Sequence, residues 1–216
     1  MIPVTSNEGP LAKPLPGFES INRYWDRLRN IPAAKILPGE CYVSACGELI
    51  STVLGSCVAA CIRDTTTGIG GMNHFMLPIQ NSDRPMLRSS VVNADLCYGN
   101  WAMEYLINSI LKTGATRKNL EVKLFGGGRV LANMKQMDIG QRNVDFVLDY
   151  LEKEGLYVAS KDLGSTCPRK ILYFPDTGAV KLKRLHTLAN NTVQIREKEY
   201  VDSLKRKPAA GDVELF

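Results

Sequence analysis

The sequence predicts a single α/β domain built on a mixed sheet. Short segments of apolar and β-branched residues, typical of buried strands, alternate with two longer segments of helical periodicity. Their order is strands, helix, strand, helix, strands, which fits an α/β or α+β sandwich. The length of 216 residues suits one domain with tails, and 44% hydrophobic with 23% charged residues is ordinary for a soluble globular protein.

The N-terminal segment, residues 1–35, is expected to be a mobile arm because it contains five prolines. Within it, residues 18–29 carry a helical stripe of apolar side chains, which predicts a short helix. The domain itself is expected to begin near Ile36. Residues 35–44 should hold its first strand region, with a turn at 37–40.

Residues 49–77 predict three strands and contain the strongest candidates for chemistry. The apolar segment 49–54 is interrupted by Gly55 and Ser56, immediately before Cys57. Alternating residues then follow to Arg63. The sequence DTTTG at 64–68 has the composition of a turn, and the apolar pattern resumes beyond it.

The register of this hairpin predicts a contact between a thiol and an imidazole. If Thr65 and Thr66 form a two-residue loop, Cys57 lies directly opposite His74, on the same face and with Cβ atoms about 4.5–5.5 Å apart. An adjacent histidine lowers the pKa of a cysteine and carries its proton, as a cysteine nucleophile requires. The alternative is a buried free cysteine beside a satisfied core histidine.

The rest of the chain supplies the other helices and strands. The helices end at glycines, Gly114 and Gly155, and the last two strands form a hairpin around the turn sequence PDTG at 175–178. Helices are expected at 91–112 and 140–154, strands at 120–125, 156–162, 169–174 and 179–185, and a surface loop at 80–90.

No cofactor and no metal are predicted. Gly126, Gly127 and Gly128 follow a strand but lack the residues of a P-loop or a complete dinucleotide fingerprint, so a tight turn near the active-site edge of the sheet is the preferred interpretation. The cysteine spacings match neither zinc nor redox motifs. The cysteines other than Cys57 are expected to be small buried residues: Cys41, Cys46, Cys61, Cys97 and Cys167.

Several separated motifs together resemble one family. They are LGSCVAACIRD, GGMNHFMLP, YGNWAMEYLIN, KLFGGG, IGQRNVDFVLDYL and RKILYFPDTGAVKLKRL, in this order. Over residues 36–186 the chain resembles CheD, the chemoreceptor glutamine deamidase family of bacterial chemotaxis. The resemblance implies a three-layer α/β/α sandwich and a cysteine hydrolase that converts receptor glutamines to glutamates. It also implies that Cys57 is the nucleophile and His74 its partner.

The expected mechanism is acyl transfer. Cys57 attacks the glutamine carboxamide, backbone N–H groups at 55–57 hold the oxyanion, and His74 protonates the departing ammonia and then activates water. A third group should orient the histidine. The resemblance places Ser51 there, with Thr52 beside it. Strand alternation allows only one of the two, and Ser51 is favoured by its position.

The resemblance also implies the partners: the cytoplasmic helices of methyl-accepting chemoreceptors as substrate and, in some family members, a CheC-type phosphatase. Two other functions remain open. One is a non-catalytic chemotaxis adaptor that binds receptors or such a phosphatase. The other is a thiol redox protein, since Cys61 would share the face of Cys57.

The chain is expected to be cytoplasmic. Its N-terminus lacks the features of a secretory signal, and no apolar segment is long enough to span a bilayer.

Residues 187–216 are expected to form a basic, solvated C-terminal tail. The region 181–207 has eight Lys or Arg and three acidic residues, so its net charge is +5. This is the formal net charge of the whole chain. Nucleic-acid binding is not expected, because interleaved aromatic residues are lacking. Steering toward an acidic receptor bundle is a second interpretation.

Overall fold

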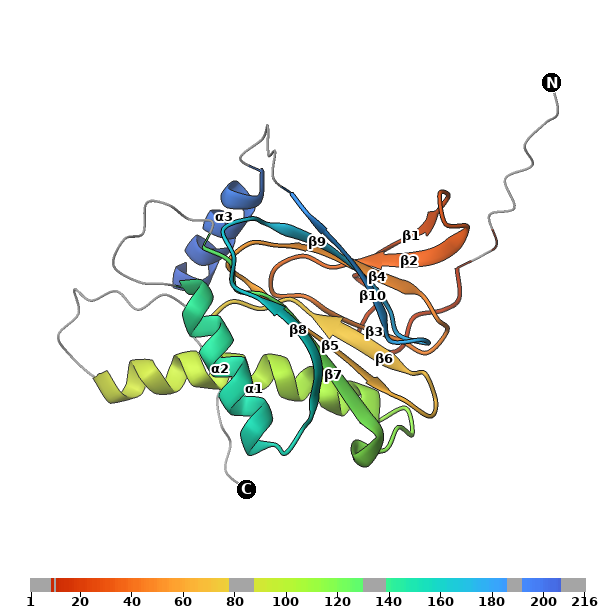
Figure 1. The fold of residues 1–216 in the computed structure, drawn as a ribbon, viewed down its shortest axis with the longest axis horizontal. Coiled ribbons are helices and arrows are strands. Elements are labelled where there is room, and N and C mark those ends of the chain that lie inside the picture. Colours follow the sequence, from red (N-terminus) through yellow and green to blue (C-terminus); the bar gives the residue numbers. More distant parts are fainter. Residues whose placement is uncertain (1–8, 10, 78–87, 130–138, 186–191, 207–216) are drawn as a thin grey trace.

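Two five-stranded sheets and three helices make up the described part of the computed structural model, residues 9, 11–77, 88–129, 139–185 and 192–206 (Figure 1). The first sheet has the order β1-β2-β4-β9-β10: β1 Asn22–Asp26, β2 Ile31–Lys35, β4 Leu49–Leu54, β9 Arg169–Phe174, β10 Ala179–Arg184. The second has the order β3-β6-β5-β7-β8: β3 Cys41–Ser44, β6 Gly70–Asn73, β5 Val58–Asp64, β7 Leu120–Gly126, β8 Val158–Leu163. The helices are α1 Arg88–Leu111, α2 Ile139–Lys153 and α3 Thr192–Arg206, with a 3₁₀ turn at Arg117–Asn119.

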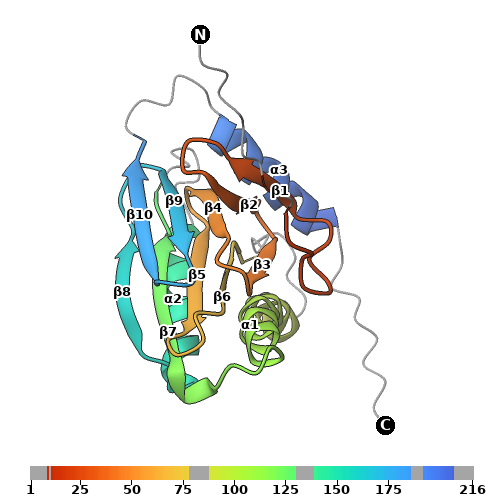
Figure 2. The ribbon, with the colours of Figure 1, turned by 90° about the vertical axis from the view of Figure 1, so that its right-hand side faces the viewer.

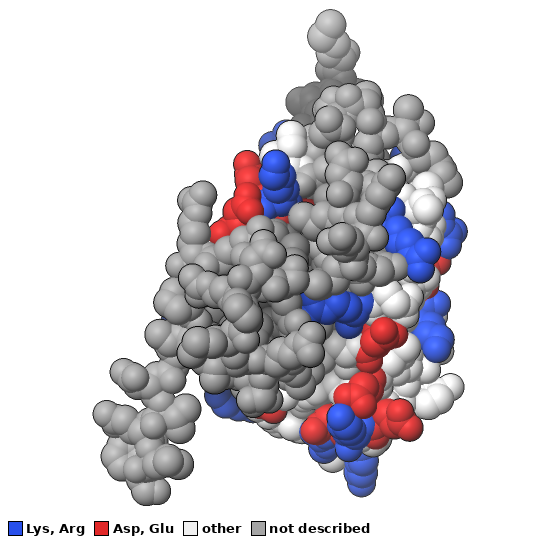
Figure 3. Space-filling model, turned by 90° about the vertical axis from the view of Figure 1, so that its left-hand side faces the viewer, with Lys and Arg blue, Asp and Glu red and all other residues white. Residues whose placement is uncertain are grey.

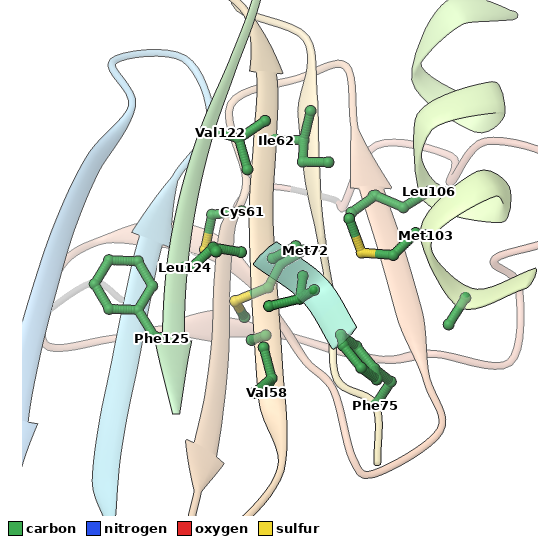
Figure 4. Close-up of a cluster of buried hydrophobic side chains, with 14 of the residues drawn as sticks. Val58, Cys61, Ile62, Met72, Phe75, Met103, Leu106, Val122, Leu124 and Phe125 are labelled. Atoms are coloured by element: carbon green, nitrogen blue, oxygen red, sulfur yellow. The ribbon is translucent and has the colours of Figure 1, made fainter. Parts of the chain in front are cut away.

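The two sheets share one hydrophobic core, and α1 and α2 pack on the second sheet (Figures 1 and 2). Ile50 and Tyr173 of the first sheet lie in the same buried cluster as Val58 of the second. On the helical side, Met103 and Leu106 of α1 point toward the strands (Figure 4). The predicted α/β class, with mixed sheets in a single domain, is confirmed. Its layers are sheet, sheet and helices, whereas the resemblance implied one sheet between two helical layers.

The alternation of side chains along β4 decides which residues face the space between the sheets. Leu49 packs with Ala33 and Leu172 in a separate small cluster on the outer face of the first sheet. Ile50 faces inward and joins the main core. Because strand neighbours point to opposite faces, Ser51 follows Leu49 outward and Thr52 follows Ile50 inward.

The N-terminal segment forms strands, and the helix predicted at 18–29 is wrong. β1 pairs antiparallel with β2, and β2 pairs parallel with β4, so both strands belong to the first sheet. Phe18 is 3% exposed and lies in the main core. In place of the predicted helix, residues 22–35 form a tight hairpin whose turn, residues 27–30, contains Asn30 at φ 54°. From Phe18 on, the predicted arm is therefore part of the fold.

The predicted two-residue loop of the central hairpin is also wrong. Asp64 N donates to Ile69 O at 2.9 Å, and β5 pairs with β6 through Cys61 with Met72 and Ile62 with Gly71. The loop thus has four residues, 65–68, because the Asp64 carboxylate accepts from the N–H groups of Thr66 and Thr67 and closes a wider turn. The register shifts by two residues, which preserves the face of every side chain.

The other predicted helices and strands are confirmed, and most of their ends differ by three residues or fewer. The strand expected to continue to residue 77 ends earlier, at Asn73. Residues 80–87 of the predicted loop lie outside the described residues, and residues 88–90 belong to α1. No helix within the described ranges is long and apolar enough to cross a membrane.

The described part of the basic region 181–207 lies almost wholly in two elements, β10 and α3. α3 lies at one end of the molecule (blue in Figure 1). On the described surface of that end, Lys and Arg side chains are interspersed with Asp and Glu (Figure 3). The prediction of a solvated tail is wrong for α3, since Glu197 is 2% exposed.

Candidate active site

Cys57 sits in a buried bend between β4 and β5 that the three glycines hold in place. Gly127 N donates to Cys57 O at 2.7 Å, and Gly128 N donates to Gly55 O at 2.7 Å. A Cβ on Gly126, which has φ 112°, would clash with Cys57 O. A side chain at this position would therefore displace the bend. The glycine run is a backbone support for Cys57, in agreement with the preferred tight-turn interpretation.

Asn143 of α2 joins this bend to the segment that follows His74. Its side-chain amide donates to Ser56 O at 2.9 Å, and its carbonyl oxygen accepts from Leu77 N at 2.9 Å. The residue is fully buried, so both hydrogen bonds are made away from water. Asn143 was not identified from the sequence as a site residue, although it lies within the IGQRNVDFVLDYL motif.

His74 follows β6, and its backbone is fixed by the turn at 37–40. Its N–H donates to Glu40 O at 2.9 Å, and its carbonyl accepts from Gly39 N at 2.7 Å. Its side chain extends toward the first sheet, where Nδ1 lies 2.8 Å from Thr52 Oγ1. The imidazole is thus held between the two sheets by groups from both.

The hydrogen bonds of Thr52 determine the protonation of His74. Thr52 Oγ1 donates its single proton to Ile36 O at 2.8 Å, so it accepts from Nδ1–H of His74. Burial lowers the pKa of His74 to about 3, which keeps the imidazole neutral. Nε2 therefore carries a lone pair, and it is buried without a hydrogen-bond partner among the described residues. Such a nitrogen can act as a general base.

The preference for Ser51 as the orienting residue is wrong. Ser51 Oγ faces the outer side of the first sheet, where it donates to Ala34 O at 3.3 Å and lies 3.5 Å from the Tyr24 hydroxyl. The two-residue period of β4 gives only Thr52 access to His74. Only one of these two neighbours can reach His74 along a strand, but the sequence did not show which face of β4 turns toward the histidine.

A carboxylate from α3 occupies the bend at Cys57. Glu197 Oε1 accepts from the backbone N–H groups of Gly55 at 3.0 Å, Ser56 at 2.8 Å and Cys57 at 3.4 Å. Its Oε2 accepts from Ser56 Oγ at 2.8 Å. These N–H groups are the ones predicted to hold an oxyanion, and they converge on one oxygen atom. No local pattern in the sequence indicated Glu197, which lies 140 residues beyond Cys57.

The thiol of Cys57 is protonated in this arrangement. Burial raises its pKa well above the ordinary value, and the negative charge of Glu197 and its hydrogen bond with the thiol raise it further. Burial also raises the pKa of Glu197, against the hydrogen bonds from Ser56, Cys57 and Gly55 that lower it. The structure therefore holds both the Cys57 thiol and the His74 imidazole in their neutral forms.

Cys57 and His74 lie on one face of the hairpin but not directly opposite each other. Val58 and Phe75 form an isolated antiparallel bridge, in which Val58 N donates to Phe75 O at 3.0 Å and Phe75 N donates to Val58 O at 2.9 Å. In that register Cys57 is a diagonal neighbour of His74, a relation that puts Cβ atoms within about 8 Å. Glu197 contacts Cys57 and lines a pocket with Thr52 and His74, so the three elements meet at one site.

The prediction that the other cysteines are buried holds for Cys61. It is wrong for Cys46, which is exposed, and for Cys41 and Cys167, which are half-buried. The side chain of Cys97 lies outside the described part of the chain. Cys57 and Cys61 are both free thiols. Four residues along an extended strand span about 13 Å, far beyond the Cα separation of a disulfide. Cys61 therefore cannot resolve an oxidised Cys57 without unfolding β5.

Comparison with known proteins gives consistent results. A family model described as CheD chemotactic sensory transduction matches residues 76–184. "Probable chemoreceptor glutamine deamidase CheD" of Saccharophagus degradans is 56% identical over 99% of this chain and 98% of its own length. Proteins of the same name from Halorhodospira halophila and Herminiimonas arsenicoxydans are 50% and 52% identical, over 94% and 90% of this chain and 93% and 94% of their own lengths.

The family-model match begins two residues after His74, so the thiol and imidazole lie outside it. The relative from Saccharophagus degradans covers almost the whole chain, including the bend at Cys57. The resemblance that the sequence motifs predicted is thereby confirmed.

Proposed function

Because this chain belongs to the CheD family, we propose that it deamidates glutamine side chains of chemoreceptors to glutamate, with Cys57 as nucleophile and His74 as acid and base. The observation that carries the chemistry is the convergence of three backbone N–H groups beside a cysteine thiol. The names of its relatives supply the substrate: they are called chemoreceptor glutamine deamidases.

The reaction begins when the proton of the Cys57 thiol passes to Nε2 of His74 as the sulfur attacks the substrate, because neither group is ionised beforehand. Nε2 is free to take this proton, since it is buried without a hydrogen-bond partner among the described residues. The sulfur attacks the glutamine side-chain carbonyl carbon. The carbonyl oxygen becomes an oxyanion and accepts hydrogen bonds from the N–H groups of Gly55, Ser56 and Cys57. When the C–N bond breaks, His74 gives its proton to the nitrogen and ammonia leaves.

The second half of the reaction consumes water. His74, again neutral, takes a proton from a water molecule that attacks the γ-glutamyl thioester. The C–S bond breaks, the glutamate product forms and Cys57 regains its proton. Thr52 acts as a positioning residue throughout, because its acceptor oxygen keeps Nδ1 protonated and leaves Nε2 to exchange protons.

We expect Thr52→Val to lower kcat by about tenfold to a hundredfold, because Nδ1–H then lacks its acceptor and the imidazole is no longer held in one tautomer and orientation. Thr52→Ser should restore most of the activity. Ser51→Ala is the matched control from the adjacent position and should stay within about twofold of the wild type. Rates of ammonia release from a receptor fragment measure all three, and equal rates for Thr52→Val and Ser51→Ala would contradict the assignment.

Two features disfavour the other functions. The separation of Cys57 from Cys61 along β5 leaves a redox cycle without a nearby resolving thiol. A non-catalytic adaptor would have no use for a histidine whose tautomer is fixed by a threonine. Neither a bound phosphatase nor a cofactor is needed for the steps above.

The proposal is tested by incubating the chain with the cytoplasmic fragment of a chemoreceptor from the same organism and mapping glutamine and glutamate by peptide mass spectrometry. We expect conversion at a few specific glutamines, together with equimolar ammonia. A fragment whose converted glutamines are replaced by asparagine is the control and should release no ammonia. Binding of the fragment without any conversion would favour the adaptor and overturn the proposal.

A further inference from the structure

We propose that α3 is an internal product mimic: Glu197 occupies the subsite for the substrate's side chain, and the surface beneath α3 is where a glutamine-bearing helix of the substrate docks. This inference rests on the proposed function and adds two things to it. It assigns the pose of the substrate side chain, and it makes displacement of α3 a condition for turnover.

The first observation is chemical. Glutamate is the product of glutamine deamidation and has the same number of side-chain atoms, hydrogens aside, as the substrate. One oxygen of the Glu197 carboxylate accepts hydrogen bonds from the three N–H groups that would bind the substrate oxygen, with N···O distances of 2.8 to 3.4 Å. The other carboxylate oxygen accepts a hydrogen bond from Ser56 Oγ and takes the place of the nitrogen that leaves as ammonia.

The second observation is the way the carboxylate is delivered. Glu197 projects from a helix of 15 residues and is buried, whereas the adjacent Arg196, Lys198 and Glu199 are exposed. A substrate glutamine on a receptor helix would be presented in the same way, as one inward side chain between outward ones. Glu197 thus reaches the bend as a single side chain from a helical backbone.

The third observation is a further anchor one helical turn along α3. Tyr200, three residues after Glu197, hydrogen-bonds through its hydroxyl to the hydroxyl of Tyr98 on α1. Its ring lies against Gly39, where an added Cβ would meet the hydroxyl oxygen at 2.7 Å. Gly39 also donates to His74 O, so α3 rests on the turn that fixes the catalytic histidine. α3 therefore contacts both the bend at Cys57 and the turn that positions His74. A substrate helix docked in its place would contact the same two segments.

A plain structural role for Glu197 makes a different prediction. If Glu197 only satisfies the N–H groups of the bend, a glutamine introduced at position 197 would not react with Cys57. A product mimic, by contrast, becomes a substrate when glutamine replaces it. The carbonyl carbon of the introduced amide would bond to sulfur, and its C–N bond would break to release ammonia. Water would then cleave the thioester to leave glutamate at position 197 and a free thiol.

The test is therefore the variant Glu197→Gln. We expect residue 197 to be found as glutamate, in part or in full, when a chymotryptic peptide is sequenced by mass spectrometry. Two matched variants should keep their glutamine: Cys57→Ala/Glu197→Gln, which lacks the nucleophile, and Glu199→Gln, which places the amide on the exposed side of the same helix. An amide that stays intact at position 197, in a preparation that deamidates the receptor fragment, would overturn the inference and leave the proposed function standing.

A second measurement does not depend on self-reaction. Glu197→Ala removes the charge and the hydrogen bond from the thiol, so alkylation of Cys57 by iodoacetamide at neutral pH should be at least about tenfold faster than in the wild type. Glu199→Ala is the control and should match the wild type. Equal rates for the two variants would overturn the inference. If no variant converts either the receptor or the amide introduced at position 197, the proposed function fails and the inference fails with it.

Discussion

Cys57→Ala is expected to abolish receptor deamidation, a loss on the order of 10⁶-fold, which is typical when an enzyme loses its nucleophile. The oxyanion N–H groups and His74 remain in that variant, but no atom can form the thioester. The thiol is fully buried, so its removal leaves a small void and should cost about 1 kcal/mol of unfolding free energy. Ammonia release from the receptor fragment measures the effect.

The control for this variant is Cys46→Ala, since Cys46 is an exposed free thiol outside the site. It should retain full activity. A thermal unfolding curve for Cys57→Ala that resembles that of the wild type shows that activity is lost for chemical reasons. Deamidation by Cys57→Ala above the background rate would contradict the assignment of the nucleophile.

His74→Gln is the second large effect, with an expected loss of about 10²- to 10⁴-fold in kcat, the range that general acid–base catalysis supplies. Glutamine preserves a polar side chain that can still reach Thr52, but its amide cannot exchange protons at neutral pH. We therefore expect the activity to stay low across the pH range. A His74→Gln rate within tenfold of the wild type would show that another group carries the proton.

The same variant tests the buried, neutral state of His74 through pH-dependent stability. The native imidazole has a pKa of about 3, whereas an unfolded histidine titrates near about 6.5. Between these values the unfolded state binds more protons, so the free energy of unfolding rises with pH and this contribution levels off above about 6.5. Wild type should lose this part of its stability on acidification, and His74→Gln should not. Parallel slopes for the two proteins would contradict a neutral buried imidazole.

The sequence was most informative where local pattern decides structure. The apolar segment 49–54 became β4, and the PDTG turn at 175–178 became the hairpin of β9 and β10 with no change of register. Cys57 and His74 were proposed as a pair from the expected register of the hairpin and from the family resemblance. The hairpin register was misjudged by two residues, yet an even shift preserves the face of each side chain.

Features set by tertiary contacts could not be predicted in the same way. Residues 18–29 have a helical stripe, but the pairing of β1 with β2 and of β2 with β4 overrides that local pattern. The choice between Ser51 and Thr52 depended on which face of β4 meets the second sheet. Glu197 had no local signal at all, because its role arises only when α3 folds back onto a bend 140 residues earlier.

The proposed mechanism requires a bond between the sulfur of Cys57 and the side-chain carbonyl carbon of a receptor glutamine. Trapping that bond is the most direct test of the mechanism. Wild-type protein is mixed with the receptor fragment, quenched in acid within one turnover and resolved by intact mass spectrometry. The predicted result is a covalent complex of the two chains, linked through the peptide that contains Cys57 and cleaved by hydroxylamine, as a thioester is. A complex linked through another residue, or formed equally by Cys57→Ala, would contradict the account.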